Sequence, residues 1–279
     1  MLQKSYETAT GLYLIPTPIG NLQDITLRAI EVLKMVDFLL CEDTRVTDQL
    51  LHQLNIKKKL LCCQDHNEEK MSSFVVDELK KGKKIGLVTD RGTPIISDPG
   101  YKVVRAVVAS GFSVIALPGP TALIPALIAS GIRPAPFLFY GFLNAKESKR
   151  EKELNSLKHD VATLIFYEAP HRIESTLQSI LKVMGDRNIA VCREISKIHE
   201  TIYRGRVSQI LSMEEPMKGE IVLIVDGNHE LEAIQSLTIR EHIQLYLDDG
   251  MSEKEAIKQV SVERNVPKSV IYKEYHTGK

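Results

Sequence analysis

Three short loops rich in proline, glycine and hydroxyl side chains hold most of the groups that could bind a ligand. They are Pro16 to Asn21 (PTPIGN), Thr89 to Gly100 (TDRGTPIISDPG) and Pro118 to Thr121 (PGPT), and each follows a short apolar run. An apolar run before such a loop predicts a buried strand that brings backbone groups to one edge of a sheet. The carboxyl ends of the strands of an open α/β sheet form a common crevice, so we expect one composite site. Three ordinary strand-to-helix turns are the alternative.

The cysteines and a nearby histidine do not form a recognisable metal or disulfide framework. Cys62, Cys63 and His66 are close in sequence, but their spacing matches no C-x-x-C pair and no fourth ligand is near. Cys41 and Cys192 lie in apolar, strand-like runs, which is typical of buried free thiols. We therefore expect neither a metal site nor disulfides.

The composition is that of a soluble globular protein long enough for two domains. Its 279 residues are 43% hydrophobic and 26% charged. Lys+Arg and Asp+Glu both number 36, so contact with nucleic acid would need local basic clusters. Candidates are Lys57 to Lys59, Lys80 to Lys84, and Arg204 with Arg206. No apolar run reaches about 18 residues, and the start of the chain (MLQKSYETAT) lacks the apolar stretch of a signal peptide. We expect a cytoplasmic protein without a membrane anchor.

Residues 11–120 are expected to form a parallel, doubly wound α/β domain. Short apolar runs alternate there with amphipathic stretches, as βαβ units require. The predicted strands are 11–15, 37–42, 59–63, 84–89 and 113–117. Asn55, Gly82 and Gly111 can each take the left-handed conformation that ends a helix. No G-x-G-x-x-G fingerprint follows the first strand, which argues against the common dinucleotide site.

Residues 121–228 are expected to form a second α/β domain with a mixed sheet. Its predicted strands are 137–142, 162–168, 188–195, 199–204 and 219–226, and its predicted helices include 173–184 and 207–213. Pro134 and Pro136 mark a hinge before it. The mixed-charge run Asn144 to Lys158 is either a solvated helix face or a patch that contacts RNA.

Residues 229–279 are expected to form a separate helical appendix. Thr238 with Glu241 and Ser252 with Glu255 are capping boxes, and Gly250 and Pro267 divide three short helices. Three short helices with a tight turn are compatible with a helix-turn-helix arrangement. Nucleic-acid contact and plain packing stay open as alternatives for this segment.

Seven motifs follow one another along the chain: PTPIGNLQDIT, CEDTR, HNE, DRGTPIISDPG, LPGPTA, FYEAPHR and GEIVLIVDG. In this order and spacing they resemble the tetrapyrrole methylase superfamily, and PTPIGN and FYEAPHR point to its ribosomal RNA branch. The resemblance covers Leu12 to about Asn228, and the appendix is similar to the extension of that branch. It implies S-adenosyl-L-methionine in the cleft between two domains, a homodimer, and 2′-O-methylation of a cytidine in the 16S rRNA of the small ribosomal subunit.

We expect the cofactor to be held by loop residues and by one aromatic side chain: Pro16, Gly20, Asp90, Gly92, Thr93, Pro94, Ser97, Asp98, Thr121, Ala122 and Tyr167. Gly92 permits close approach of the backbone, and Thr93 offers a hydroxyl. A turn cap is the alternative for Asp90, and a helix N-cap is the alternative for Ser97 and Asp98.

The acceptor that the resemblance implies is a weakly acidic ribose hydroxyl, so a general base or a nearby cation would help. Glu168, His171 and Arg172 of FYEAPHR are our first choice, because this motif faces the cleft in the resembled fold. Further candidates follow the second and third predicted strands: Glu42, Asp43, Arg45, His66 and Glu68. For each of them, an interdomain hydrogen bond or salt bridge is the alternative.

Arg91 departs from the family pattern, which usually has alanine between the equivalents of Asp90 and Gly92. An unpaired buried cation is costly, so we expect its side chain to point outward to phosphate. Arg45, His66 and Arg91 are therefore the predicted substrate-binding residues. A small-molecule tetrapyrrole methylase and a noncatalytic RNA-binding assembly factor are the competing functions.

Overall fold

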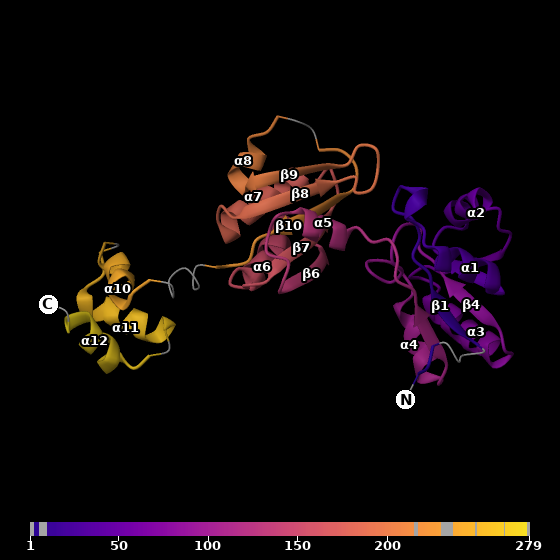
Figure 1. Ribbon diagram of the computed structural model, residues 1–279, viewed down its shortest axis with the longest axis horizontal. Coiled ribbons are helices and arrows are strands. Elements are labelled where there is room, and N and C mark those ends of the chain that lie inside the picture. Colours follow the sequence, from indigo (N-terminus) through magenta and orange to yellow (C-terminus); the bar gives the residue numbers. More distant parts are fainter. Residues whose placement is uncertain are drawn as a thin grey trace.

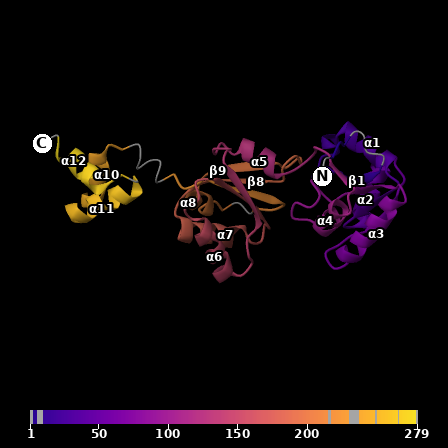
Figure 2. The same ribbon diagram turned by 90° about the horizontal axis from the view of Figure 1, so that it is seen from below.

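The computed structural model describes residues 3–5, 10–214, 217–229, 237–248, 250–264 and 266–277. Figure 1 and Figure 2 show three groups of elements that follow one another along the long axis of the molecule. Two of them are built on a five-stranded sheet, and the third is a set of helices. One sheet is parallel and the other mixed, which confirms the predicted α/β class.

The first sheet has the strand order β3-β2-β4-β1-β5, and all its neighbours are parallel. Its strands are β1 (Gly11–Leu14), β2 (Phe38–Cys41), β3 (Lys59–Cys62), β4 (Lys84–Leu87) and β5 (Ser113–Ala116). The connecting helices are η1 (Leu22–Asp24), α1 (Leu27–Met35), α2 (Thr44–Gln53), α3 (Glu68–Lys80) and α4 (Tyr101–Ala109). Leu39 packs into the core on one face of this sheet and Leu40 into the core on the other. Both faces are covered, so the strands are apolar throughout and their carboxyl ends form one edge.

The second sheet has the order β6-β7-β10-β8-β9, with β6 and β7 parallel and the other neighbours antiparallel. Its strands are β6 (Phe137–Phe142), β7 (Thr163–Glu168), β8 (Asn188–Arg193), β9 (Thr201–Arg206) and β10 (Ile221–Val225). The helices of this part are α5 (Leu123–Ala129), α6 (Glu147–Leu157), α7 (Ile173–Met184) and α8 (Val207–Leu211).

The two faces of the second sheet have different partners. Side chains of α6, α7 and α8 form the core on one face, whereas Ala126 and Leu127 of α5 pack on the other. Ile19, from the loop after β1, also packs into this second core. The Ile19 side chain thus packs the loop after β1 against the second sheet.

The C-terminal helices are α10 (Ile239–Asp248), α11 (Glu253–Glu263) and α12 (Lys268–His276). They enclose a small core of their own that includes Ile243, Ile257 and Ile271. Both predicted capping boxes form, because Glu241 accepts from the Thr238 amide and Glu255 from the Ser252 amide. In the described part of the chain, every helix falls short of the length and hydropathy needed to cross a membrane.

Candidate functional site

A cavity of about 640 Å³ lies where the carboxyl ends of the first sheet meet the second sheet. It is lined by Ile19, Val46, Asp90, Arg91, Gly92, Thr93, Ile96, Ser97, Asp98, Thr121, Ala122, Phe142, Tyr167, Glu168, Ala169, Pro170, Ile195, Glu220, Ile221 and Val222. The volume is within the usual range for a small-molecule site.

The three Pro/Gly loops touch one another at this cavity. Thr17 and Gly92 exchange two backbone hydrogen bonds, with N–O distances of 2.9 and 3.0 Å. The Thr93 hydroxyl donates to the Pro120 carbonyl at 3.0 Å. Gly119 packs so closely on Pro16 that a Cβ there would lie 2.7 Å from the proline ring. The loop after β4 is therefore clamped between the other two loops.

The loop after β4 holds four residues with positive φ. Gly92 and Gly100 have φ of 85° and 127°, and Ile95 and Ser97 have φ of 77° and 69°. Positive φ is rare for a β-branched residue such as Ile95, and each such non-glycine residue costs about 1–3 kcal/mol. Strain of this kind is kept where the surrounding structure fixes a loop for function.

Glu68, at the start of α3, holds the far end of this loop. One carboxylate oxygen, Oε1, accepts from the Gly100 amide at 2.9 Å and from the Lys102 amide at 2.7 Å. Glu68 is 5% exposed, and α4 begins at this point. The N-cap alternative for Ser97 and Asp98 is therefore wrong, because a buried carboxylate from another helix satisfies these amides.

Carboxylates dominate the first-sheet side of the cavity. Asp90 and Asp98 line it, and Asp90 Oδ1 accepts from the Asp43 amide at 3.1 Å, so Asp90 also fixes the start of α2. Burial raises the pKa of Asp98, and nearby Asp90 raises it further. Burial also raises the pKa of Glu42, with added repulsion from Asp90 and Asp98. This negative wall suits a positively charged ligand.

Aromatic rings form the opposite wall. Tyr167 lies with its ring centroid 4.9 Å from that of Phe139 and 5.8 Å from that of Phe142. Burial raises the pKa of the Tyr167 hydroxyl, which is hydrogen-bonded to the Thr121 side chain. Phe142 is 54% exposed and lines the cavity, so one aromatic face is open at its mouth.

Arg91 lies at the mouth of the cavity and pairs with Glu220 of the second sheet at 2.5 Å. Both side chains are more than half exposed. Lys197 joins the same cluster through Glu220 and Glu194, at 2.8 and 2.9 Å. The aliphatic part of Lys197 covers Gly20 so closely that a Cβ on Gly20 would collide with it. The guanidinium thus bridges the two sheets at the rim of the cavity.

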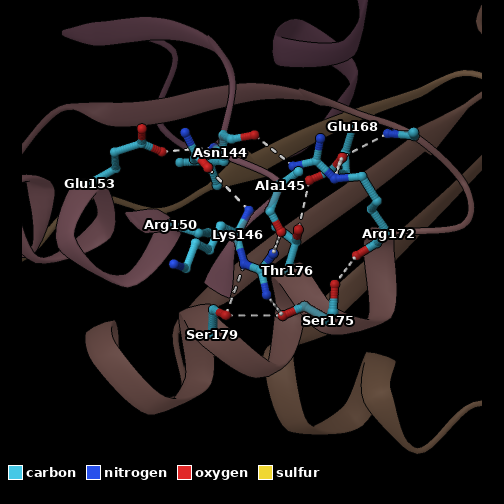
Figure 3. A network of polar contacts seen from close by, with 12 residues as sticks. Asn144, Ala145, Lys146, Arg150, Glu153, Glu168, Arg172, Ser175, Thr176 and Ser179 are labelled. Atoms are coloured by element: carbon cyan, nitrogen blue, oxygen red, sulfur yellow. Dashed lines mark hydrogen bonds and ion pairs between the residues drawn. The ribbon is translucent and has the colours of Figure 1, made fainter. Parts of the chain in front are cut away.

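Glu168 and Arg172 belong to a buried polar network that secures the second sheet's loops (Figure 3). Glu168 is 3% exposed, and it accepts from the Thr176 hydroxyl at 2.6 Å and the Ala169 amide at 2.8 Å. Arg172 pairs with Glu168 at 3.2 Å and donates to the Leu143 carbonyl at 2.6 Å. These contacts favour the structural alternative for both residues.

Arg150 extends this network from α6 (Figure 3). It is 4% exposed and donates to the Ser179 hydroxyl at 2.9 Å and to the Ser175 carbonyl at 3.2 Å. The mixed-charge run Asn144 to Lys158 is thus not a uniformly solvated face. One of its cations ties α6 to α7.

The remaining candidates lie outside the cavity lining. Pro16 and Pro94 are buried within their loops, and His171 and His66 are exposed. Arg45 is exposed and paired with Asp43 at 2.6 Å, and this hydrogen bond lowers the pKa of Asp43 to about 2.

Sequence reasoning missed the apolar lining and Glu220. The missed apolar residues are Ile19, Val46, Ile96, Phe142, Ala169, Pro170, Ile195, Ile221 and Val222. Apolar side chains in strands and turns resemble core residues, so their types give no signal of a site. Glu220 is the second residue of the motif GEIVLIVDG, and its place in that motif was the signal that could have identified it as a site residue.

The basic clusters proposed for RNA lie away from this edge. Lys57 to Lys59 and Lys80 to Lys84 precede or begin β3 and β4, whereas the cavity is at the carboxyl ends of the strands. Arg204 donates to the Ala129 carbonyl at 2.6 Å, and Arg206 to the Asp186 carbonyl at 2.7 Å. Many of these cations serve local structure.

The four cysteines are free thiols, and Cys41, Cys63 and Cys192 are buried. Burial raises the pKa of the Cys63 thiol to about 12, which keeps it protonated and unreactive. No group of three or more His, Cys, Asp or Glu side chains in the described ranges is arranged to hold a metal.

Comparison with known proteins places this geometry among methylases. The family model for tetrapyrrole (corrin/porphyrin) methylases matches residues 11–211. A ribosomal RNA small subunit methyltransferase I from Bacillus subtilis (strain 168) is 46% identical over 273 residues, which cover 95% of this chain and 94% of the relative. A protein of the same name from Streptococcus pyogenes serotype M1 is 40% identical over 283 residues, covering 99% of each chain.

Two solved structures share the fold. The methyltransferase CobJ matches with a TM-score of 0.59 at 16% identity, over 78% of this chain and 94% of its own. A uroporphyrin-III-C-methyltransferase from Thermus thermophilus matches with a TM-score of 0.54 at 18% identity, over 78% of this chain and 93% of its own.

Proposed function

The chain belongs to the tetrapyrrole methylase family, and we propose that it transfers a methyl group from S-adenosyl-L-methionine to the 16S rRNA of the small ribosomal subunit. We further propose that the acceptor is the 2′-hydroxyl of a cytidine. Near full-length similarity to relatives named ribosomal RNA small subunit methyltransferase I supports the substrate class. The observation that carries the chemistry is the cavity where the three Pro/Gly loops meet.

The residues of this cavity fit a cationic methyl donor. S-adenosylmethionine supplies a sulfonium-bound methyl group that a nucleophile can attack directly. Asp90 and Asp98 give the wall the opposite charge, and Arg91 is already paired with Glu220. Gly92, held with φ of 85°, lines the cavity without a side chain, so a ligand can approach the loop closely there.

The protein's contribution to such a transfer is position and exclusion of water. An in-line displacement needs donor and acceptor held within reach, and a preorganised loop provides this at no further entropic cost. The strained loop after β4 fixes the side of the cavity that belongs to the first sheet, and the network around Glu168 and Arg150 supports the side that belongs to the second sheet. Phe142 offers an open aromatic face on which the base of an unstacked nucleotide can rest.

A small-molecule tetrapyrrole methylase is the second candidate, because the family model is that of tetrapyrrole methylases and one solved structure with this fold is a uroporphyrin-III-C-methyltransferase. The relatives named ribosomal RNA small subunit methyltransferase I are 46% and 40% identical to this chain over nearly its whole length, whereas the two solved structures are 16% and 18% identical. This difference favours RNA as the proposed acceptor.

The test uses purified full-length protein, labelled S-adenosylmethionine and small subunits assembled with unmodified 16S rRNA. We expect the label to enter the rRNA. We also expect the phosphodiester bond that follows one cytidine to resist alkaline hydrolysis, because a 2′-O-methyl group blocks cleavage of the adjacent phosphodiester. Binding of the donor without transfer to subunits, free rRNA or a tetrapyrrole would instead support a noncatalytic assembly factor. A homodimer stays a prediction, to be measured by light scattering.

A further inference from the structure

We propose that Asp98 accepts the proton of the ribose hydroxyl during methyl transfer, an assignment that rests on the function proposed above. Asp98 is half-buried, and it lines the cavity at the end of the strained loop after β4. Sequence reasoning gave this residue to the cofactor or to a helix cap. Its surroundings point to a different role.

The first observation is that Asp98 is not needed to cap the N-terminus of α4, the usual role of an aspartate that precedes a helix. The amides of Gly100 and Lys102, at the start of α4, both donate to Glu68 Oε1. The carboxylate of Asp98 is therefore left to line the cavity. Ser97, directly before it, has φ of 69°, and Gly100 beyond it has φ of 127°. The loop is held in a conformation that does not use this carboxylate as its cap.

The second observation is the set of groups that face Asp98 from neighbouring elements. They are the Thr89 hydroxyl and the Asp90 carboxylate on its own loop, Glu42 after β2, and Tyr167 on β7. Burial and the Asp90 charge both raise the pKa of Asp98, while the Thr89 hydroxyl works in the other direction. A carboxylate surrounded by other carboxylates and by apolar walls is a better base than one in water.

The third observation is that the competing bases are occupied or lie elsewhere. Both oxygens of Glu168 accept hydrogen bonds inside the second sheet's network. His171 is exposed and Glu42 is half-buried, and both residues lie outside the cavity lining. The Tyr167 hydroxyl has a raised pKa and is therefore protonated at neutral pH. Glu220 is paired with Arg91 and Lys197, and Asp90 Oδ1 accepts from the Asp43 backbone amide. Among the described residues Asp98 has only the Thr89 hydroxyl, a weaker partner than a cation, so it is the lining carboxylate best placed to take a proton.

The chemical step balances with these groups alone. A lone pair of the ribose 2′-oxygen forms the new bond to the methyl carbon. The carbon–sulfur bond breaks, and its electron pair stays on sulfur, which becomes a neutral thioether. The hydroxyl proton passes to a carboxylate oxygen of Asp98 and then to solvent when the product leaves.

The experiment compares the wild type with Asp98→Asn, which keeps the shape of the side chain but cannot act as a base. Single-turnover transfer to unmodified small subunits is measured from pH 4 to 9, and S-adenosylmethionine affinity by calorimetry. We expect the rate to fall by about 10²–10⁴-fold, whereas the donor Kd should weaken by no more than about tenfold, because Asp90 still gives the cavity wall a negative charge. The wild-type rate should fall as the pH is lowered through the pKa of Asp98, and Asp98→Asn should lose this acidic limb.

Two further variants sharpen the test. Asp98→Ala should regain part of its rate when formate is added, because a small carboxylate can occupy the vacated position. Asp65→Asn is the control, since it removes an exposed negative charge near Glu42 and should transfer at the wild-type rate.

Each other outcome overturns the assignment. If Asp98→Asn turns over within a fewfold of the wild type, Asp98 is not the proton acceptor. If its donor Kd weakens in step with the rate and formate does not rescue Asp98→Ala, Asp98 is a cofactor ligand. If the wild type itself transfers no methyl group to any RNA, the proposed function and this assignment both fall.

Discussion

Removing the Glu68 carboxylate should detach the cofactor loop from its support. In Glu68→Ala, the Gly100 and Lys102 amides lose the oxygen that accepts from them at 2.9 and 2.7 Å. A buried donor left unsatisfied costs about 1–3 kcal/mol, and the Gly100 amide is buried. Loss of an anion at a helix N-terminus costs about 0.3–1 kcal/mol more. We therefore expect the free energy of unfolding to fall by about 1–4 kcal/mol.

Glu68→Gln separates the two contributions. It keeps an acceptor oxygen but removes the charge, so it should cost only about 1 kcal/mol. Glu69→Ala is the matched control, because its carboxylate is 86% exposed and lies 3.4 Å from Lys102. A surface change of this kind should stay within about 0.5 kcal/mol of the wild type.

Urea unfolding measures the stabilities, hydrogen exchange measures protection at the start of α4, and calorimetry measures donor affinity. We expect Glu68→Ala to lose protection at Tyr101 to Val104 and to bind S-adenosylmethionine more weakly, because the loop after β4 is no longer fixed. A Glu68→Ala variant as stable as Glu69→Ala would refute the capping role. Full stability and protection with lost donor affinity would instead mean that Glu68 contacts the donor directly.

Three further outcomes follow from single contacts. Gly92→Val should abolish donor binding in calorimetry, because φ of 85° strains a branched residue and its Cβ would lie 3.2 Å from Ile19; unchanged affinity in a folded variant would remove this loop from the site. Arg91→Ala should change the donor Kd by less than about fivefold, because the exposed ion pair of Arg91 with Glu220 contributes about 0–1 kcal/mol. A loss of RNA affinity alone would support the phosphate contact expected from the sequence, and a loss of donor affinity alone would contradict it. Hydrogen-exchange protection of α10 and α11 should fall as the pH drops below about 6.5. Burial lowers the pKa of His242 in the folded protein, so the unfolded segment takes up a proton at a higher pH than the folded one and is stabilised by it. Protection that is flat from about pH 7.5 to 5.5 would contradict this.

His242 also shows how a tertiary contact decides a protonation state. The Arg264 Nε–H donates to His242 Nδ1 at 3.0 Å, so that nitrogen must carry a lone pair. The Nε2–H therefore donates to Glu263 Oε2 at 2.9 Å. Protonation of Nδ1 would break the first contact, which is consistent with the lowered pKa.

The local features of the fold could be read from the sequence, because each depends on residues a few positions apart. The strands predicted at 11–15 and 84–89 are β1 and β4, and their apolar runs reflect burial on both faces of a parallel sheet. Asn55, Gly82 and Gly111 have φ of 54°, 83° and 82°, as expected for residues that end helices. The capping boxes formed for the same reason, since a side chain and an amide three residues away meet in any helix start.

The partners of the site residues were decided only by the order in which the strands lie side by side. Glu68 caps α4 because the order β3-β2-β4 brings the start of α3 next to the loop after β4, 32 residues away in sequence. Arg91 meets Glu220 across 129 residues because two separate sheets meet at the cavity. A local pattern fixes the conformation of a segment, but it carries no information on which distant backbone amide or charge that segment will meet. For this reason the sequence identified the loops and the family, whereas only the tertiary structure separated Glu168 and Glu68, which support the site, from Asp98, which faces into it.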